Sequence, residues 1–151
     1  MKTHHTIIKF RTKEKYQFID LTGDIQEIIK YSEITNGIIN IVSRHTTTAI
    51  LLNENEPLLL NDFLNLIKNF LIFEPKNYQH NDLELRKKIY PQLAADECQN
   101  GDAHCRSIFL TNSQTLNIID GQLDFGQWQS ILFLELDRAK SREISVMIIG
   151  E

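Results

Sequence analysis

Three histidines in polar surroundings are the residues of this chain best suited to chemistry: His45, His80 and His104. Side chains with carboxylate or amide groups lie near them in the sequence, namely Asn53, Glu54, Asp82 and Asp102. Imidazoles are the commonest metal ligands in proteins, and they exchange protons near neutral pH. The number of these histidines and their polar neighbours predict that they meet in one site.

A divalent metal ion is the first hypothesis for such a site. A catalytic metal needs about three protein ligands and one open position for water or substrate. His45, His80 and His104 supply three imidazoles from distant segments. Cys98 and Cys105 lack the close pairing of structural zinc sites, so the expected ion is catalytic, zinc-like or magnesium-like. The alternative is that each histidine is a hydrogen-bonded structural residue.

Two arginines and two acids are candidates for other roles at this site. Arg44 and Arg106 each lie within two positions of one of the histidines. We expect these arginines to bind an anionic substrate, because guanidinium groups pair well with carboxylates and phosphates. Glu54 or Asp82 is the expected proton carrier. The remaining arginines and lysines are expected on the solvated surface.

Two polar residues fall on an otherwise apolar face of the strand predicted over Gln129 to Asp137. Alternate side chains of a strand share a face, which places Gln129 and Glu135 with Ile131 and Phe133. Burying such groups unpaired costs about 1–3 kcal/mol each. Either this part of the face is exposed or the two residues join a polar cluster. We favour a cluster that reaches the histidines, with catalytic roles for both residues.

Composition places the chain among single-domain proteins without a basic excess. It has 151 residues, 42% of them hydrophobic and 24% charged, with a net charge of -4. This charge argues against non-specific binding to nucleic acid or to a membrane surface. No apolar run has the length of a membrane span, and no signal peptide or disulfide framework is indicated, so we expect a cytoplasmic protein. No phosphate-binding glycine loop or nucleophile elbow occurs, and covalent catalysis is not expected.

Alternating and β-branched residues predict most of the chain to be β-structure. The expected strands cover residues 7–13, 16–21, 38–43, 45–52, 116–119, 123–125, 129–137 and 144–149. The pair Asp120-Gly121 favours a tight two-residue hairpin. If the chain stays extended from Ile38 to Leu52, His45 lies near the polar end of a buried strand.

Helical spacing of apolar residues predicts the remaining elements. A helix is expected to begin at Thr22, and the clearest amphipathic helix covers Leu58 to Leu71. Shorter helices are indicated over Leu83 to Tyr90 and from Asn100 or Asp102 to about residue 110. The fold class is therefore α+β, with six to eight mostly antiparallel strands and two to three helices, because short connections favour antiparallel pairing.

Four segments together resemble the YjbQ-like family, some members of which carry the label secondary thiamine-phosphate synthase. The matching segments read S-R-H-T-T-T-A-I-L-L-N-E-N-E, Y-Q-H-N-D, C-Q-N-G-D-A-H-C-R-S and D-G-Q-L-D-F-G-Q-W-Q-S-I-L-F-L-E-L-D, followed by a terminal I-I-G-E. The resemblance covers nearly the whole chain from Gly37 onward. One departure falls at Asp137-Arg138-Ala139-Lys140, where many relatives read D-G-P-R.

The resemblance implies a single domain over residues 1–151 with a β-sandwich-like core that forms a homotrimer. It also implies that the three histidines gather in a cleft, near a subunit boundary. Further positions match the family pattern and are carried over as site residues: Asn53, Glu54, Asp120, Gln129 and Glu135. Among these, Asn53 and Asp120 are expected to contact substrate.

Two classes of function follow from these expectations. The first is a metal-dependent enzyme acting on a phosphorylated small molecule. If the family label applies, the reaction joins a pyrimidine pyrophosphate to a thiazole phosphate and releases pyrophosphate. The second is a non-catalytic trimer that binds a small anion or metabolite. Detection of a product formed at a rate sensitive to the histidines would separate the two classes.

Overall fold

The chain folds into eight strands and four α-helices across residues 1–70, 75–93 and 97–151, the part that the computed structural model describes. In chain order the elements are β1 (Lys2–Arg11), β2 (Gln17–Asp20), α1 (Thr22–Ser32), β3 (Gly37–Ser43), β4 (Thr48–Asn53), α2 (Pro57–Phe70), α3 (Leu83–Ile89), α4 (Gly101–Ser107), β5 (Ser113–Ile119), β6 (Gln122–Asp124), β7 (Ser130–Glu135) and β8 (Ser141–Gly150). Two short 3-10 turns, η1 (Pro75–Asn77) and η2 (Gln79–Asn81), precede α3. The predicted end of the α2 helix at Leu71 lies outside the described residues.

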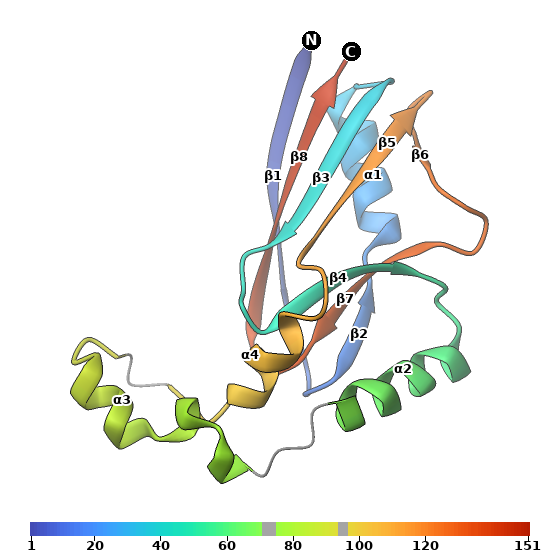
Figure 1. Ribbon diagram of the computed structural model, residues 1–151. Helices are drawn as coiled ribbons and strands as arrows, with labels where there is room; N and C mark the ends of the chain where they lie inside the picture. The colour runs from blue at the N-terminus through green and yellow to red at the C-terminus, as the bar shows by residue number, and fades with distance from the viewer. Residues whose placement is uncertain (71–74, 94–96) are drawn as a thin grey trace.

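The strands form two antiparallel sheets, as Figure 1 shows. The larger sheet has the order β1-β8-β3-β5-β6, and the smaller has the order β2-β7-β4. The first and last long strands pair along their whole length, so the two termini lie side by side. Gly37 permits the close approach of β3 to β8, because a Cβ at this position would collide with the backbone of Ile149 and Gly150.

The β5–β6 connection is the hairpin that the sequence predicts. Asp120 and Gly121 have φ angles of 51° and 73°. Positive φ at both central residues defines the type I′ turn, whose twist matches that of the paired strands. The prediction of a tight turn at this position is confirmed.

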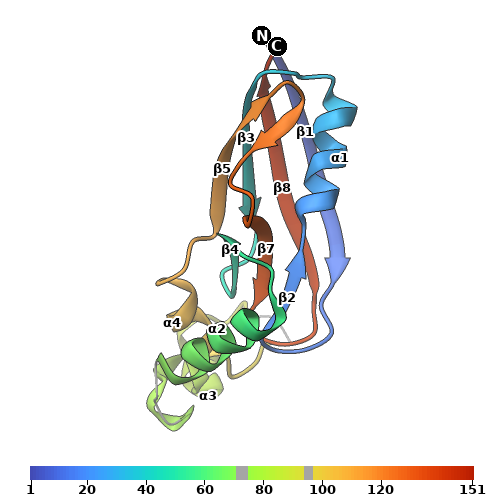
Figure 2. The same ribbon diagram turned by 90° about the vertical axis from the view of Figure 1, so that its right-hand side faces the viewer.

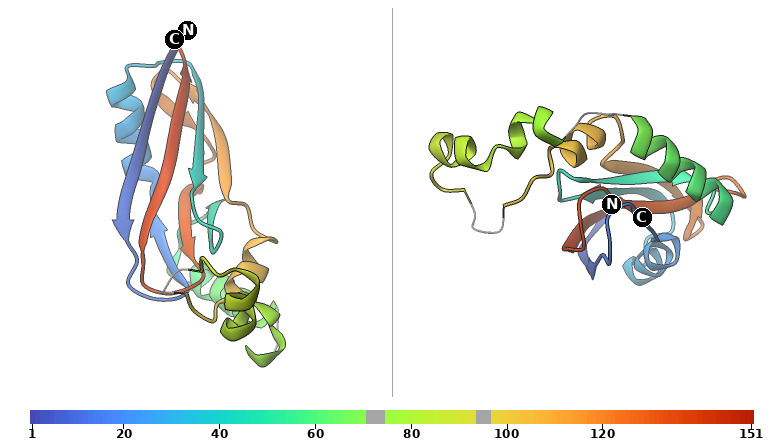
Figure 3. Two further views of the ribbon diagram at one scale, coloured as in Figure 1. Left: turned by 90° about the vertical axis from the view of Figure 1, so that its left-hand side faces the viewer. Right: turned by 90° about the horizontal axis from the view of Figure 1, so that it is seen from below.

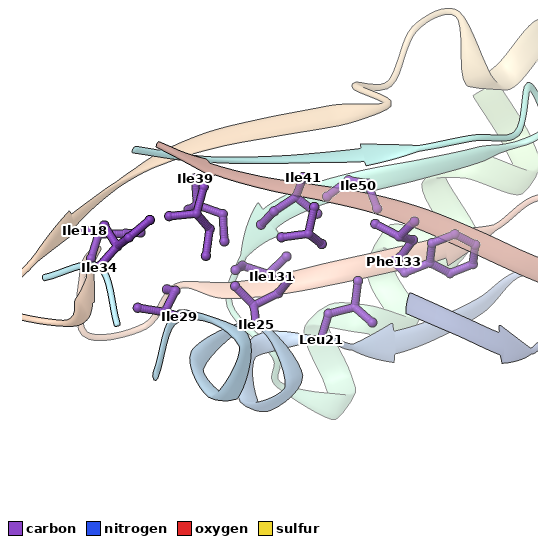
Figure 4. Packing of buried hydrophobic residues seen from close by; sticks show 13 residues of the cluster. Leu21, Ile25, Ile29, Ile34, Ile39, Ile41, Ile50, Ile118, Ile131 and Phe133 are labelled. Carbon is purple, nitrogen blue, oxygen red and sulfur yellow. The ribbon is translucent and has the colours of Figure 1, made fainter. Parts of the chain in front are cut away.

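The main core lies between the larger sheet and a layer made of α1 and β7, shown from close by in Figure 4. Ile39 and Ile41 from β3 face Ile25 and Ile29 from α1, and all four are at most 1% exposed. Figure 2 shows α1 alongside the larger sheet. Burial of each such side chain contributes about 1.5–3 kcal/mol, so this cluster fixes the relative position of sheet and helix.

A smaller core holds the remaining helices at one end of the molecule. Ile67 of α2 and Ala103 of α4 pack with Ala49, Leu134 and Leu136 from the smaller sheet and its edge. Figure 3 shows α3 projecting away from both sheets, whereas α4 stays close to them. The α+β class with mostly antiparallel strands is confirmed, although the described residues contain four α-helices and the sequence predicted two to three.

Candidate functional site

The segment around His45 is a turn and not a continuous strand. β3 ends at Ser43 and β4 begins at Thr48, and the two strands belong to different sheets. The expectation of an unbroken strand from residue 38 to 52 is therefore wrong. Ser43 Oγ and Thr48 Oγ1 lie 2.5 Å apart and close the turn. Nε2 of His45 accepts a hydrogen bond of 2.8 Å from the backbone N–H of Glu143 on β8, which fixes the imidazole ring.

A buried ion pair lies beneath this turn. Arg142 and Glu135 are 2% and 0% exposed, and the guanidinium donates from Nε and Nη2 to the two carboxylate oxygens at 2.6 and 2.5 Å. Thr12 and the backbone N–H of Asp137 also donate to this carboxylate. Nη2 of Arg142 donates further to Thr47 at 3.4 Å, but its Nη1 has no partner among the described residues. We call Glu135, Arg142 and residues 44–47 the sheet wall.

The opposite side of the site is built from η2 and α4. The rings of His80 and His104 pack edge to face, with centroids 4.7 Å apart. The side chain of Asn81 accepts a hydrogen bond from the N–H of Gly101 and so joins η2 to the start of α4. Nδ2 of Asn100 donates to Asp137 at 3.1 Å. We call His80, Asn100 and His104 the helical wall.

A pocket of about 230 Å³ lies between the two walls. Its lining residues come from the 44–47 turn, from the start of α4 and from the β7–β8 connection: Arg44, His45, Thr46, Thr47, Glu97, Cys98, Asn100, His104, Asp137, Arg138, Lys140 and Arg142. Four of these residues are cationic and two carry carboxylates. The pocket therefore carries an excess of positive charge, in a protein whose net charge is negative.

The two histidines that line this pocket favour their neutral forms. Burial lowers the pKa of His45, and the nearby Arg142 guanidinium lowers it further. Burial also lowers the pKa of His104, with a second contribution from His80. A neutral imidazole can accept a proton through the lone pair of one ring nitrogen. In His45 this lone pair already accepts the backbone N–H of Glu143, so His104 is the ring of the two that is suited to proton transfer.

Cys98 lines the same pocket but is not prepared for nucleophilic attack. Burial raises the pKa of its thiol, and the neighbouring Asp137 carboxylate raises it further. The thiolate is the reactive form of cysteine, so a raised pKa makes the residue less reactive.

Two buried polar atoms on the helical wall have no hydrogen-bond partner among the described residues. They are Nε2 of His80 and Oδ1 of Asn100. Asn100 as a whole is 8% exposed. Buried polar atoms in folded proteins are almost always paired, so unpaired ones indicate a position for a ligand or an ordered water.

The predicted site residues divide into those near the pocket and those elsewhere. Arg44, His45 and His104 line the pocket. Glu135 is paired with Arg142, which also lines it, and the ring of His80 packs against that of His104. Thus the three histidines do lie in one region of the fold, but only two of them reach the pocket surface.

Asp82 and Arg106 have structural partners away from the pocket. Oδ1 of Asp82 accepts a hydrogen bond from the N–H of Leu85, which makes Asp82 the N-cap of α3. Arg106 is 7% exposed and donates to the backbone carbonyls of Ile67 and Lys68, so it joins α4 to the end of α2.

The other four predicted residues are also separate from the pocket. Asn53 ends β4, and its side chain accepts a hydrogen bond from the N–H of Glu54. Asp120 occupies the β5–β6 turn, and Gln129 accepts from the N–H of Gly126 before β7 begins. No hydrogen bond links any of these four to the histidines in the described parts of the chain.

The three histidines as arranged do not fit a three-ligand metal site. Within the described residues, no group of three His, Cys, Asp or Glu side chains is placed to hold a metal ion. Nε2 of His45 already accepts a backbone N–H, which leaves the proton of the neutral ring on Nδ1 and no lone pair for a metal. A metal role for His80 and His104 stays a prediction.

Several pocket residues were not among those predicted from the sequence: Cys98, Asn100, Asp137, Arg138 and Lys140. One signal for them was available, because Asp137 to Lys140 is the segment where the chain departs from the family pattern. For Asn100, the sequence indicates only a possible helix cap. Their convergence depends on the β7–β8 connection lying against α4, which no local pattern reveals.

The chain belongs to the family described as UPF0047 protein YjbQ-like, whose profile matches residues 6–151. It is 34% identical over 151 residues to a UPF0047 protein of Methanothermobacter thermautotrophicus, covering 100% of this chain and 95% of the relative. A UPF0047 protein of Methanocaldococcus jannaschii is 33% identical over 144 residues, covering 95% and 92% of the two chains.

Solved structures show the same fold. A YbjQ-like protein of unknown function from Sulfolobus solfataricus superimposes with a TM-score of 0.79 at 30% identity, covering 99% of both chains. A hypothetical protein from Aeropyrum pernix gives a TM-score of 0.75 at 26% identity over the full length of both chains. No helix in the described part of this chain is long and apolar enough to cross a membrane.

Proposed function

We propose that the pocket between the two walls binds the phosphate group of a small molecule. The observation that carries this proposal is the buried guanidinium of Arg142. Glu135 fixes two of its nitrogens, and Nη1 has no partner within residues 1–70, 75–93 and 97–151, while Arg142 lines the pocket. A guanidinium group that is fixed in place and has a free N–H₂ is well suited to pair with phosphate oxygens.

The other lining charges support an anionic ligand. Lys140 and Arg44 line the same pocket, and Arg44 reaches it while paired with Glu143 at 2.7 Å. Both carboxylates have partners of their own: Asp137 accepts hydrogen bonds from Asn100 and Cys98, and Glu97 forms an ion pair with Arg86 at 2.9 Å. The unpaired Oδ1 of Asn100 can accept a hydrogen bond from a protonated phosphate or a ligand hydroxyl.

The imidazole of His104 makes an enzyme the first function class. His104 has a depressed pKa and lies beside the pocket, so it can accept a proton from a water or hydroxyl nucleophile during transfer or hydrolysis of the phosphorylated compound. His80 contacts its ring and can hold it in position. The thiamine-phosphate synthase reaction expected from the family resemblance is one member of this class.

Anion binding is tested by isothermal titration with inorganic phosphate and pyrophosphate. We expect saturable binding that weakens at least about tenfold in Arg44→Ala and in Lys140→Ala, since each loses one phosphate contact. Lys9→Ala is the matched control: Lys9 also pairs with Glu143 at 3.2 Å but does not line the pocket. Equal affinities in all four proteins, or no binding, would contradict the proposal.

Catalysis is tested separately, with a panel of phosphate esters and with the pyrimidine pyrophosphate and thiazole phosphate pair. An enzyme forms product at a rate that His104→Ala lowers at least about a hundredfold, while phosphate affinity changes little. Binding without any turnover would instead support the second class, a protein that holds an anionic metabolite without converting it.

A homotrimer is the assembly that we propose for the protein. The outer face of the larger sheet exposes apolar side chains on three strands, Ile38 of β3, Ile119 of β5 and Met147 of β8, each at least 36% exposed. Exposed apolar groups on a sheet face are typical of surfaces that associate. Light scattering after size exclusion should give three times the monomer mass of 17.6 kDa, and a monomer would contradict this.

A further inference from the structure

A second cavity adjoins the phosphate pocket and shares four lining residues with it: Arg44, His45, Thr46 and His104. Its volume is about 750 Å³, compared with about 230 Å³ for the phosphate pocket. The turn at 44–47 and helix α4 line both cavities. Ser107 Oγ on α4 is joined to this turn, because it donates a hydrogen bond to the carbonyl of Thr46 at 2.7 Å. The two cavities therefore form one continuous site with the histidines at the junction.

The two parts of this site differ in charge. Six charged residues line the phosphate pocket, whereas Arg44, one of the shared residues, is the one charged side chain that the described residues contribute to the lining of the larger cavity. The rest of that lining is hydroxyl, amide or aliphatic: Ser43, Thr48, Ser107, Ile108, Leu110 and Asn112. Ile108 follows directly after α4 and is 76% exposed. An exposed aliphatic side chain beside polar groups is typical of a surface that contacts an uncharged organic ligand.

We propose that the ligand is a phosphate monoester whose uncharged organic group occupies the larger cavity. This inference rests on the proposed function, and it adds the substrate class. A ligand with a second charged group is not favoured, because the larger cavity offers no additional cation or carboxylate among its lining residues. A bare inorganic anion would leave the larger cavity unused.

The position of the histidines agrees with such a ligand. His45 and His104 line both cavities, so the atom that joins phosphate to the organic group lies beside the imidazoles. A water that gives a proton to His104 can attack phosphorus, so that a bond to the water oxygen forms while the bond to the oxygen of the organic group breaks. The imidazolium then returns the proton to the departing oxygen, and the products are inorganic phosphate and an alcohol. The organic group then determines which monoesters the site accepts, and the phosphate supplies binding common to all of them.

Titration calorimetry with two probes tests the inference. Inorganic phosphate fills the small pocket alone, and phenyl phosphate adds an uncharged ring for the larger cavity. We expect phenyl phosphate to bind about tenfold more tightly, since the ring buries apolar surface. Ile108→Ala should reduce that advantage about threefold or more and leave the affinity for inorganic phosphate unchanged. The matched control is Ile89→Ala, which changes an exposed isoleucine at the end of α3, outside both cavities and outside the proposed trimer surface.

The outcomes separate this inference from the function on which it rests. If inorganic phosphate binds and Arg44→Ala weakens it, the phosphate site stands. Equal affinity for the two probes, or an advantage that Ile108→Ala and Ile89→Ala change to the same extent, would then overturn the assignment of the larger cavity alone. If neither probe binds, or if Arg44→Ala has no effect on either, both proposals fall.

Discussion

The sheet wall and the helical wall of the pocket differ in how completely their polar atoms are paired. On the sheet wall, both carboxylate oxygens of Glu135 accept more than one hydrogen bond, and His45 is fixed by the N–H of Glu143. On the helical wall, His80 and Asn100 each keep one buried polar atom without a partner in the described part of the chain.

This difference indicates separate roles for the two walls. Glu135 and Arg142 of the sheet wall lie on β7 and β8, two strands that also contribute to the hydrophobic cores. The guanidinium of Arg142 is therefore held in one geometry before any ligand binds. The helical wall is attached through α4 and the short η2 turn, and it keeps two buried polar atoms without a partner in the described part of the chain. A preorganised guanidinium on one side and the neutral His104 imidazole on the other suit a site that binds an anion and moves a proton.

The largest change in the free energy of unfolding is expected from breaking the ion pair between Arg142 and Glu135 in the sheet wall. Arg142→Met leaves the carboxylate of Glu135 buried without its cation, which should lower the free energy of unfolding by about 3–5 kcal/mol. Denaturant unfolding measures this loss. The double variant Arg142→Met/Glu135→Leu should recover most of it, because neither charge of this pair then remains buried.

An exposed ion pair near the same turn is the control for this prediction. Arg44→Ala removes the contact with Glu143, and the two side chains are 54% and 34% exposed. Exposed pairs contribute about 0–1 kcal/mol, so the stability should hardly change. A similar loss in Arg44→Ala and Arg142→Met would show that the sheet wall is not specially dependent on its buried pair.

The helical wall can be tested with a pair of glycine substitutions. A Cβ at Gly101 would lie 2.8 Å from Cβ of Tyr78 and 3.1 Å from Oδ1 of Asn81. Gly101→Ala should therefore push α4 away from η2 and lower stability by about 1–3 kcal/mol. Gly23→Ala in α1 meets nothing within 4 Å and should be neutral or stabilising by up to about 1 kcal/mol. Thermal unfolding of both variants measures the contrast, and equal changes would refute tight packing of this wall.

A smaller effect is expected for Asp82, which caps α3 beyond the helical wall. Asp82→Ala removes the hydrogen bond from the N–H of Leu85 and should lower the free energy of unfolding by about 1 kcal/mol. Asp82→Asn, which keeps an acceptor oxygen, should cost less. If Asp82 carries a proton in catalysis instead, Asp82→Asn would abolish turnover while stability stays close to that of the wild type.

The smallest expected effect is a pH dependence of the stability, to which His45 of the sheet wall and His104 of the helical wall both contribute. The pKa values of His45 and His104 are lowered in the folded protein. Below the ordinary histidine pKa of about 6.5, the unfolded chain therefore binds protons that the folded chain resists, and stability falls as the pH falls from 7 toward 5.5. His45→Gln and His104→Gln should each make this decrease shallower in chemical unfolding experiments. A wild-type stability that rises over the same interval would contradict the sign.

Much of the fold could be predicted from local patterns. The stripe of α1, the amphipathic run of α2 and the Asp120-Gly121 turn each depend on neighbouring residues, so the sequence carries their signal. The break at residues 44–47 could not be predicted in the same way. β-branched residues on both sides of it favour an extended chain, and the turn forms because β3 and β4 pair in different sheets.

The site could be predicted only in part, for a related reason. His45 and His104 stood out by residue type, but Arg142 was one of many cations, and its importance comes from burial beside Glu135. Asn53 and Gln129 match the family pattern at the sequence level, yet their hydrogen bonds here are local. Three-dimensional contact between the β7–β8 connection and α4 decides which polar residues share the pocket.

The imidazole groups can report directly whether an anion binds between the two walls. In a phosphate titration followed by ¹⁵N-edited NMR of the histidine rings, the resonances of His45 and His104 should shift to a common saturation point. His4 and His5, on β1 away from the pocket, should not shift. Unchanged spectra for His45 and His104, or equal shifts at all of these histidines, would contradict the account.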